Sequence, residues 1–153
     1  MTQEARKNAY RYCQFRDTQF ALYDAYAKRH GLSLKTLLVV NVLYYAPEGM
    51  TQTEICRRTL QSKQTVNQIV RHLLAAAHVT TAEVPSDKRN KTIRMTPAGR
   101  ACYGAVVRHI TWAEDTAMSL LSAEEQQQLI ALSRTFTHHL TRLVQQEREE
   151  AEA

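Results

Sequence analysis

The side chains best suited to chemistry in this sequence are amides, hydroxyls and cations, gathered in one short segment. In order, they are Ser62, Lys63, Gln64, Thr65, Asn67, Gln68 and Arg71. Asn and Gln can pair bidentately with adenine, whereas Arg and Lys can meet guanine or phosphate. The set therefore favours recognition of a double-stranded nucleic acid over catalysis.

The spacing of the apolar residues in the same segment predicts a helix that turns those polar groups outward. Val66, Ile69, Val70, Leu73 and Leu74 share one face of a helix from Lys63 to about Ala77, with Ser62 as its cap. Burying five such side chains stabilises the helix by about 1.5–3 kcal/mol each. The polar set is then left on the opposite face, where a groove of DNA could meet it.

A second group of candidate residues lies in a short polar stretch further along the chain. It consists of Asp87, Lys88, Arg89, Asn90 and Lys91. Three cations so close together repel one another unless an anion meets them, and a narrow minor groove accepts an inserted arginine. Asp87 could orient the guanidinium of Arg89 through charge-assisted hydrogen bonds. The alternative is a plain surface ion pair, worth about 0–1 kcal/mol.

The distribution of charge supports a binding face on this part of the chain. Between Arg57 and Arg94 there are eight Lys and Arg residues against two acidic residues, although the whole chain carries only +5. Excess positive charge confined to one segment is typical of a face that binds a polyanion. A solvated basic surface is the alternative.

Two helices are predicted ahead of this segment. Residues 4–30 lack Gly and Pro and carry an approximate helical stripe of apolar residues, which Gly31 ends. Ser33 then caps a segment, Leu34 to Tyr45, that is apolar nearly all round and therefore predicts a buried central helix.

A short third helix is predicted from Thr51 to about Leu60. Thr51 and Glu54 have the spacing of a capping box. Thr51 and Thr53 stand at the start of this helix, where hydroxyl and backbone N–H groups can bind a phosphate. Together with the following helix it forms a helix-turn-helix, whose second helix fits the major groove.

The rest of the chain predicts a hairpin and two long helices. Val79–Val84 and Lys91–Met95 are rich in β-branched residues and flank a polar turn. Pro97 then opens a helix to about Leu120, and a final helix begins after Ser122 and frays into the acidic stretch Glu147–Glu152. The expected fold is mainly α with a small β-hairpin wing.

In order and spacing, three motifs resemble the MarR family of winged helix-turn-helix transcriptional regulators. They are the recognition-helix run Ser62–Val70, the wing run Asp87–Lys91, and the exit run Met95–Gly99. The resemblance covers about residues 32–100 and implies a DNA-binding lobe there, with 1–31 and 101–153 as a helical dimerisation region. The chain departs from the family pattern at three positions: Ala77 replaces a glycine, Thr81 an arginine and Met95 a leucine.

The resemblance also implies how such a protein works. A homodimer would place two winged lobes on one palindromic operator, with Arg89 in the minor groove and Asp87 holding it. Repression is the commoner mode in the family, and crevices between its helices often take small aromatic effectors. Aromatic residues that could line such a pocket are Tyr12, Phe15, Tyr44, Tyr45 and Trp112. At helical spacing, core packing is the alternative.

Other functions are weighed against this one. Cys13 in the first helix could make the chain a redox sensor, although a small buried residue is the simpler interpretation. A helical adaptor that has lost DNA binding is a further alternative. The six histidines show no metal-ligand spacing, and no pattern typical of an enzyme or of a cofactor site is found.

Three widely spaced cysteines and the lack of an apolar signal segment predict a cytoplasmic protein that does not enter a membrane.

Overall fold

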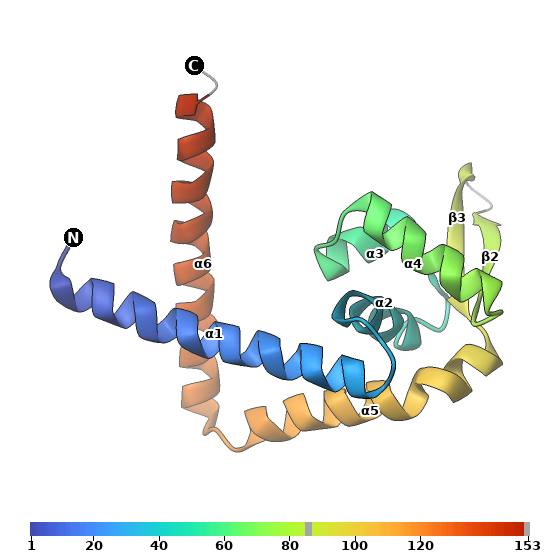
Figure 1. The fold of residues 1–153 in the computed structure, drawn as a ribbon, viewed down its shortest axis with the longest axis horizontal. Coiled ribbons are helices and arrows are strands. Elements are labelled where there is room, and N and C mark those ends of the chain that lie inside the picture. Colours follow the sequence, from blue (N-terminus) through green and yellow to red (C-terminus); the bar gives the residue numbers. More distant parts are fainter. Residues whose placement is uncertain (85–86, 152–153) are drawn as a thin grey trace. The chain divides into compact units, whose positions relative to one another are not determined.

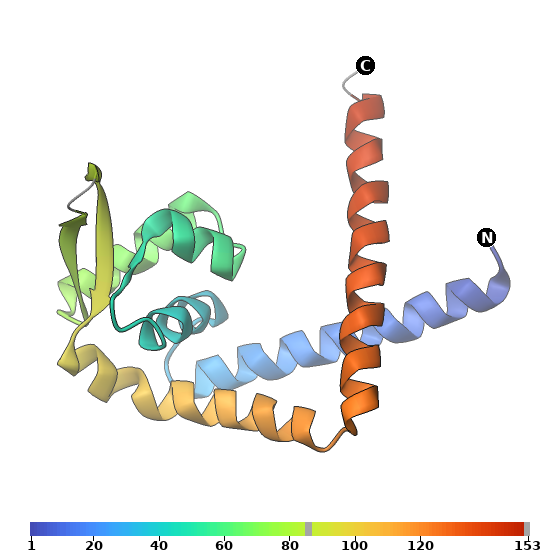
Figure 2. The same ribbon diagram turned by 180° about the vertical axis from the view of Figure 1, so that it is seen from behind.

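The computed structural model describes the backbone of residues 1–84 and 87–151, and the side chains of residues 1–83 and 91–146 (Figures 1 and 2). The elements are α1 (Gln3–Arg29), α2 (Leu34–Tyr44), β1 (Met50–Thr51), α3 (Gln52–Thr59), α4 (Lys63–Ala75), β2 (Val79–Val84), β3 (Asp87–Met95), α5 (Pro97–Ser119) and α6 (Ala123–Ala151). The mainly α fold with a small wing is confirmed. The chain divides into two compact units, Met1–His109 and Ile110–Ala153, which are described separately.

Helix α2 forms the centre of the first unit. It contacts α1, α3, α4 and β3, and five of its residues are buried: Leu34, Leu37, Val39, Val40 and Leu43. Helices α3 and α4 add Ile55, Val66, Ile69, Val70 and Leu73 to this core. The prediction of a buried central helix is therefore confirmed, because an apolar segment surrounded by other elements has no face left for water.

The helix caps are those that the sequence predicts. The side chains of Ser33 and Ser62 accept hydrogen bonds from the backbone N–H of Thr36 and Thr65. Thr51 forms the full capping box with Glu54. These caps define where α2, α3 and α4 begin, and they fix the register of each buried face.

Three antiparallel strands form the wing, in the order β1-β3-β2. The prediction that the second long strand begins at Lys91 is wrong, since β3 already begins at Asp87. Strand β1, only two residues long, was not predicted because it is too short to show an alternating pattern. It pairs through Met50 opposite Ile93.

Gly49 allows this pairing. Its φ is +81°, and a Cβ placed on it would lie 2.6 Å from the carbonyl oxygen of Ile93. Both the backbone angle and the lack of space exclude an ordinary side chain. Gly49 therefore lets β1 approach the edge of β3 immediately before α3 begins.

Two details of the helices correct the sequence-based expectations. Leu74 is 38% exposed, so α4 buries four of the five predicted residues. Helix α6 continues to Ala151, so the helix does not fray at the start of the acidic stretch. Among the described residues, no helix combines the length and apolar character needed to cross a membrane.

Candidate nucleic-acid interface

Helix α4 carries the predicted polar set on its exposed face. Six residues of the set are exposed (Ser62, Lys63, Gln64, Asn67, Gln68 and Arg71), and Thr65 is half-buried. The four buried residues of α4 hold the opposite face on the core. Because those contacts fix the rotation of the helix about its axis, the polar groups have a defined direction.

The start of α4 is tied to the start of α3. The side-chain amide of Gln52 donates a hydrogen bond of 3.1 Å to the backbone carbonyl of Lys63. This contact holds the two helices of the helix-turn-helix at their amino ends. Sequence reasoning did not single out Gln52, because an amide at the first position of a helix carries no distinctive pattern.

Of the two threonines predicted to bind phosphate, Thr51 is committed to the cap. Its backbone N–H donates to the Glu54 carboxylate at 2.7 Å, and its hydroxyl donates to the same oxygen at 2.8 Å. The backbone and side-chain hydrogen bonds from Thr51 lower the pKa of Glu54. A phosphate at Thr51 would have to displace this carboxylate, whereas Thr53 is exposed beside it.

A cleft of about 360 Å³ separates α3 and α4 from the wing. Its lining combines an apolar floor with polar and cationic sides: Gln52, Thr53, Lys63, Asn67, Val70, Leu74, Thr81, Lys91 and Ile93. Leu74 is exposed because it lies on this cleft rather than in the core. The cleft brings Thr53, Lys63, Asn67 and Lys91 of the predicted set together, although they come from three elements.

The wing can be described in part. Lys91 is exposed and lies opposite Glu83 in the strand register. The side chains of Asp87, Lys88, Arg89 and Asn90 lie outside the described residues, so their predicted roles stay predictions. Arg94, at the other end of β3, donates to the carboxylate and to the backbone carbonyl of Glu48, at 3.0 Å each. One charge of the basic segment is therefore partnered within the chain.

Comparison with known proteins finds a family model that matches part of this arrangement. A family model described as the MarR family matches residues 30–90, which hold α2, α3, α4 and most of the wing. The match to the MarR family model therefore spans the helix-turn-helix and the adjoining part of the wing.

Solved structures of MarR regulators show the same fold. AbsC, a MarR family transcriptional regulator from Streptomyces coelicolor, is 18% identical, with 92% of this chain and 97% of AbsC covered and a TM-score of 0.75. MepR of S. aureus in its DNA-binding conformation is 24% identical, covering 86% and 98%, with a TM-score of 0.72. The MepR–DNA complex is 22% identical, with 87% of this chain and 97% of MepR covered and a TM-score of 0.68. At these identities the likeness shows the fold alone. The comparison with curated proteins gives no match.

The departure from the MarR pattern at Ala77 has a structural consequence. Ala77 has a φ of +57°, in the left-handed region that a glycine adopts without cost. The end of α4 is still closed normally, since the N–H of His78 donates to the carbonyl of Leu73 at 2.8 Å. Alanine at this position therefore allows α4 to end in the left-handed conformation, but its positive φ strains the backbone.

One further residue of the α4 face was missed. His72 is exposed and, with Gln64, Asn67, Gln68 and Arg71, lines a broad depression on the outer side of α4. It lies four residues after Gln68, on the same helical face. That spacing could have placed it in the predicted set.

The predicted effector residues are only partly brought together in this MarR fold. The rings of Tyr44 and Tyr45 meet edge to face, with centroids 5.2 Å apart. The Tyr44 hydroxyl accepts a hydrogen bond of 2.8 Å from Arg108, and the Arg100 guanidinium lies over the Tyr44 ring. Tyr12 and Phe15 lie exposed on α1, and Trp112 belongs to the second unit.

The remaining reactive groups show no further site. Within the described part of the chain, no three His, Cys, Asp or Glu residues gather as a metal site would need. Cys13 and Cys56 are half-buried and Cys102 is exposed.

Proposed function

We propose that this chain is a transcriptional regulator that binds duplex DNA, with α4 in the major groove and the wing against the minor groove. The observation that carries the proposal is the exposed polar face of α4, fixed in direction by four buried residues on its other face. The cleft beside it adds Lys63 and Lys91, whose charges suit the phosphates between the two grooves.

The proposal includes a homodimer, supported by apolar side chains exposed outside the winged lobe. On α1 they include Phe15, Phe20 and Leu22, which are 62–69% exposed, and on α6 they include Leu132, Leu143 and Val144, at 53–70%. Single exposed apolar residues are ordinary, but several large ones on each of two long helices are typical of interaction surfaces.

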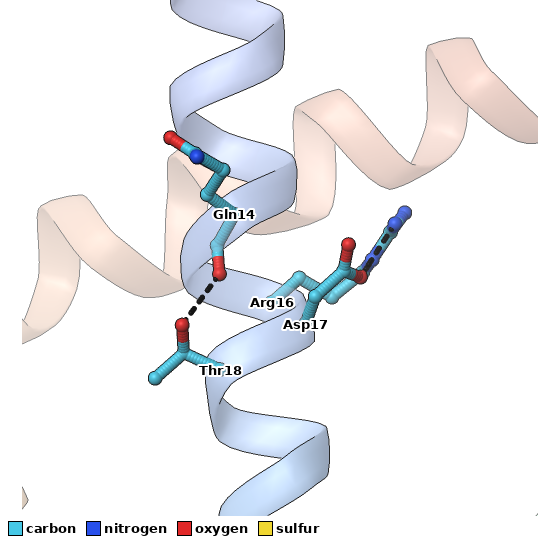
Figure 3. A network of polar contacts seen from close by, with 4 residues as sticks. All are labelled: Gln14, Arg16, Asp17 and Thr18. Atoms are coloured by element: carbon cyan, nitrogen blue, oxygen red, sulfur yellow. Dashed lines mark hydrogen bonds and ion pairs between the residues drawn. The ribbon is translucent and has the colours of Figure 1, made fainter.

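The polar contacts of α1 do not compete with this surface. Figure 3 shows the Arg16 guanidinium against the Asp17 carboxylate and the Thr18 hydroxyl donating to the carbonyl of Gln14. All are local and solvent-exposed, so each contributes little to stability. We propose that residues 1–31 and 101–153 form the dimerisation region and that 32–100 form the DNA-binding lobe.

The direct test is a selection of duplexes from a random-sequence library by the purified protein, followed by titration at several salt concentrations. We expect a palindrome with half-sites about one helical turn, 34–36 Å, apart. Affinity should fall steeply with salt because phosphate contacts release counterions. A flat response to salt, or no enrichment of any sequence, would contradict the proposal.

The role of α4 is tested by Arg71→Ala against Arg134→Ala. Both arginines are exposed and helical, but Arg134 lies on α6 in the second unit. Arg71→Ala should weaken binding to the selected duplex by about 1–3 kcal/mol if it reads a base. Equal losses in the two variants would show that only net charge matters.

We further propose that the regulator acts as a repressor and is released by a small aromatic effector. The grouping of Tyr44 and Tyr45 with two arginines of α5 supports an aromatic ligand that carries an anionic group. Such a ligand must bind the DNA-free dimer more tightly than the bound one. Arg108→Gln, which removes the guanidinium and keeps an amide, should abolish release without changing DNA affinity.

A further inference from the structure

Four elements meet at the base of the wing, and side chains join them there. Helix α4 ends at Ala75, β2 begins at Val79, β3 ends at Met95 and α5 begins at Pro97. Thr96 is the central residue of this junction. Its backbone N–H donates to the carbonyl of His78 at 3.0 Å, and its hydroxyl donates to the carbonyl of Ala77 at 2.8 Å.

The same hydroxyl closes the start of α5. It accepts a hydrogen bond of 3.0 Å from the N–H of Gly99. Gly99 packs so closely that a Cβ would clash with the carbonyl oxygen of His78. The turn that links α4 to β2 and the first turn of α5 are therefore packed backbone against backbone.

A hydrogen bond between two side chains also spans this junction. Nδ1 of His78 and the hydroxyl of Tyr103 are 2.8 Å apart, and the two rings meet edge to face with centroids 5.1 Å apart. Tyr103 is 9% exposed. Burial raises the pKa of Tyr103, and which atom of the pair donates depends on the tautomer of the imidazole.

From this geometry we infer that His78 and Tyr103 are positioning residues that set the direction of the wing relative to α4. The inference rests on the proposed DNA-binding function. His78 is the last residue before β2, and Tyr103 is in α5, which the core holds through Tyr103 itself and Val107. The hydrogen bond therefore links the start of the wing to a rigid element. It adds to the hydrogen bonds of Thr96 and to the buried side chains of Val79 and Met95, which also hold the hairpin in place.

The test uses Tyr103→Phe, which removes the hydroxyl and keeps the ring. Tyr26→Phe is the matched control, because Tyr26 is also buried and its hydroxyl donates a comparable hydrogen bond, 2.9 Å, to the carbonyl of Val106. We expect Tyr103→Phe to bind the selected duplex about three- to tenfold more weakly than Tyr26→Phe.

A double-mutant cycle separates positioning from general stability. Tyr103→Phe should be coupled to Arg89→Ala in the wing and additive with Gln64→Ala on α4, since a displaced wing loses its own contacts only. His78→Asn, which keeps a polar group near Nδ1, should retain more affinity than His78→Leu. Additivity with Arg89→Ala, or coupling of the same size to Gln64→Ala, would overturn the inference.

A measurement without DNA distinguishes failure of the inference from failure of the proposed function. Amide hydrogen exchange in β2 and β3 should be faster in Tyr103→Phe than in Tyr26→Phe, while exchange in α4 stays the same. If no duplex binds but this difference is found, the DNA-binding proposal fails and the positioning contact stands. If wing exchange is equal in the two variants, the positioning role is wrong.

Discussion

Helices α4 and α1 differ in how much of their apolar surface is buried within the chain. Helix α4 has 13 residues and buries four of them against its own chain, which leaves a polar face for solvent or a ligand. Helix α1 has 27 residues and buries only Tyr26 and Ala27. Its large apolar side chains, such as Phe15 and Phe20, stay exposed.

The difference shows which parts of the sequence are satisfied by the chain alone. A helix with one buried and one polar face is complete within its unit. A helix that leaves several large aromatic side chains exposed gains further stability when another surface covers them. In this molecule the first kind carries the candidate DNA contacts, and the second kind carries the proposed dimer contacts.

The largest effect is expected in the core of the winged lobe. Ile55 of α3 is fully buried, so Ile55→Ala should lower the free energy of unfolding by about 2–5 kcal/mol through lost burial and a residual cavity. Urea unfolding measures this. Phe15→Ala, at a 69% exposed position, should have little effect within one chain. If both variants lost the same free energy of unfolding at low protein concentration, the two regions would not differ in the way described.

The next effect concerns the exposed apolar row of α6. Leu143→Glu places a charge at a 59% exposed position and should weaken the proposed dimer about tenfold or more, because the charge must be desolvated when the surface is covered. Sedimentation velocity over a range of concentrations measures it. Gln145→Glu, which adds the same charge two residues away, is the control. If the wild-type protein is monomeric at every concentration, the proposed dimer is wrong.

A smaller effect is expected at the strained end of α4. Ala77→Gly should raise the free energy of unfolding by about 0.5–1 kcal/mol, because glycine adopts the φ of +57° without the penalty that a Cβ brings. Ala101→Gly, on the exposed side of α5, should lower it by about 0.5–1 kcal/mol. Thermal unfolding of both variants tests the sign, and destabilisation by both changes would mean that Ala77 is not strained.

The smallest effect compares the caps of the two regions. Hydrogen bonds from the backbone and side chain of Thr51 lower the pKa of Glu54, and those of Ser122 lower the pKa of Glu125. Each carboxylate therefore stabilises the fold above its unfolded pKa, and this contribution is lost as pH falls through the lower folded pKa. Glu54→Gln and Glu125→Gln should both be less stable than wild type at pH 7 and should approach it near pH 3. A difference that persists at pH 3 would contradict this cause.

The sequence predicted the lobe well because its signals are local. Caps at Ser33, Thr51 and Ser62 and the apolar spacing of α4 depend on residues within one or two turns, and the structure confirms them. The polar face of α4 follows from the same spacing.

What the sequence could not predict depends on distant contacts. Strand β1 exists because Met50 meets Ile93, and Leu74 is exposed because a cleft lies beside it. The link between His78 and Tyr103 joins residues 25 positions apart, and no periodicity indicates such a pair. The side chains of the wing from Asp87 to Asn90 were predicted from charge and resemblance and stay predictions.

The two glycines with positive φ differ in which substitutions they can accept. At Gly31 a side chain would meet nothing within 4 Å, so asparagine, which tolerates the left-handed conformation, is an acceptable replacement. At Gly49 any Cβ meets the backbone of β3. A substitution there would force β1 away from β3 and shift the first turn of α3, so position 49 sets the spacing between α3 and the long strands of the wing.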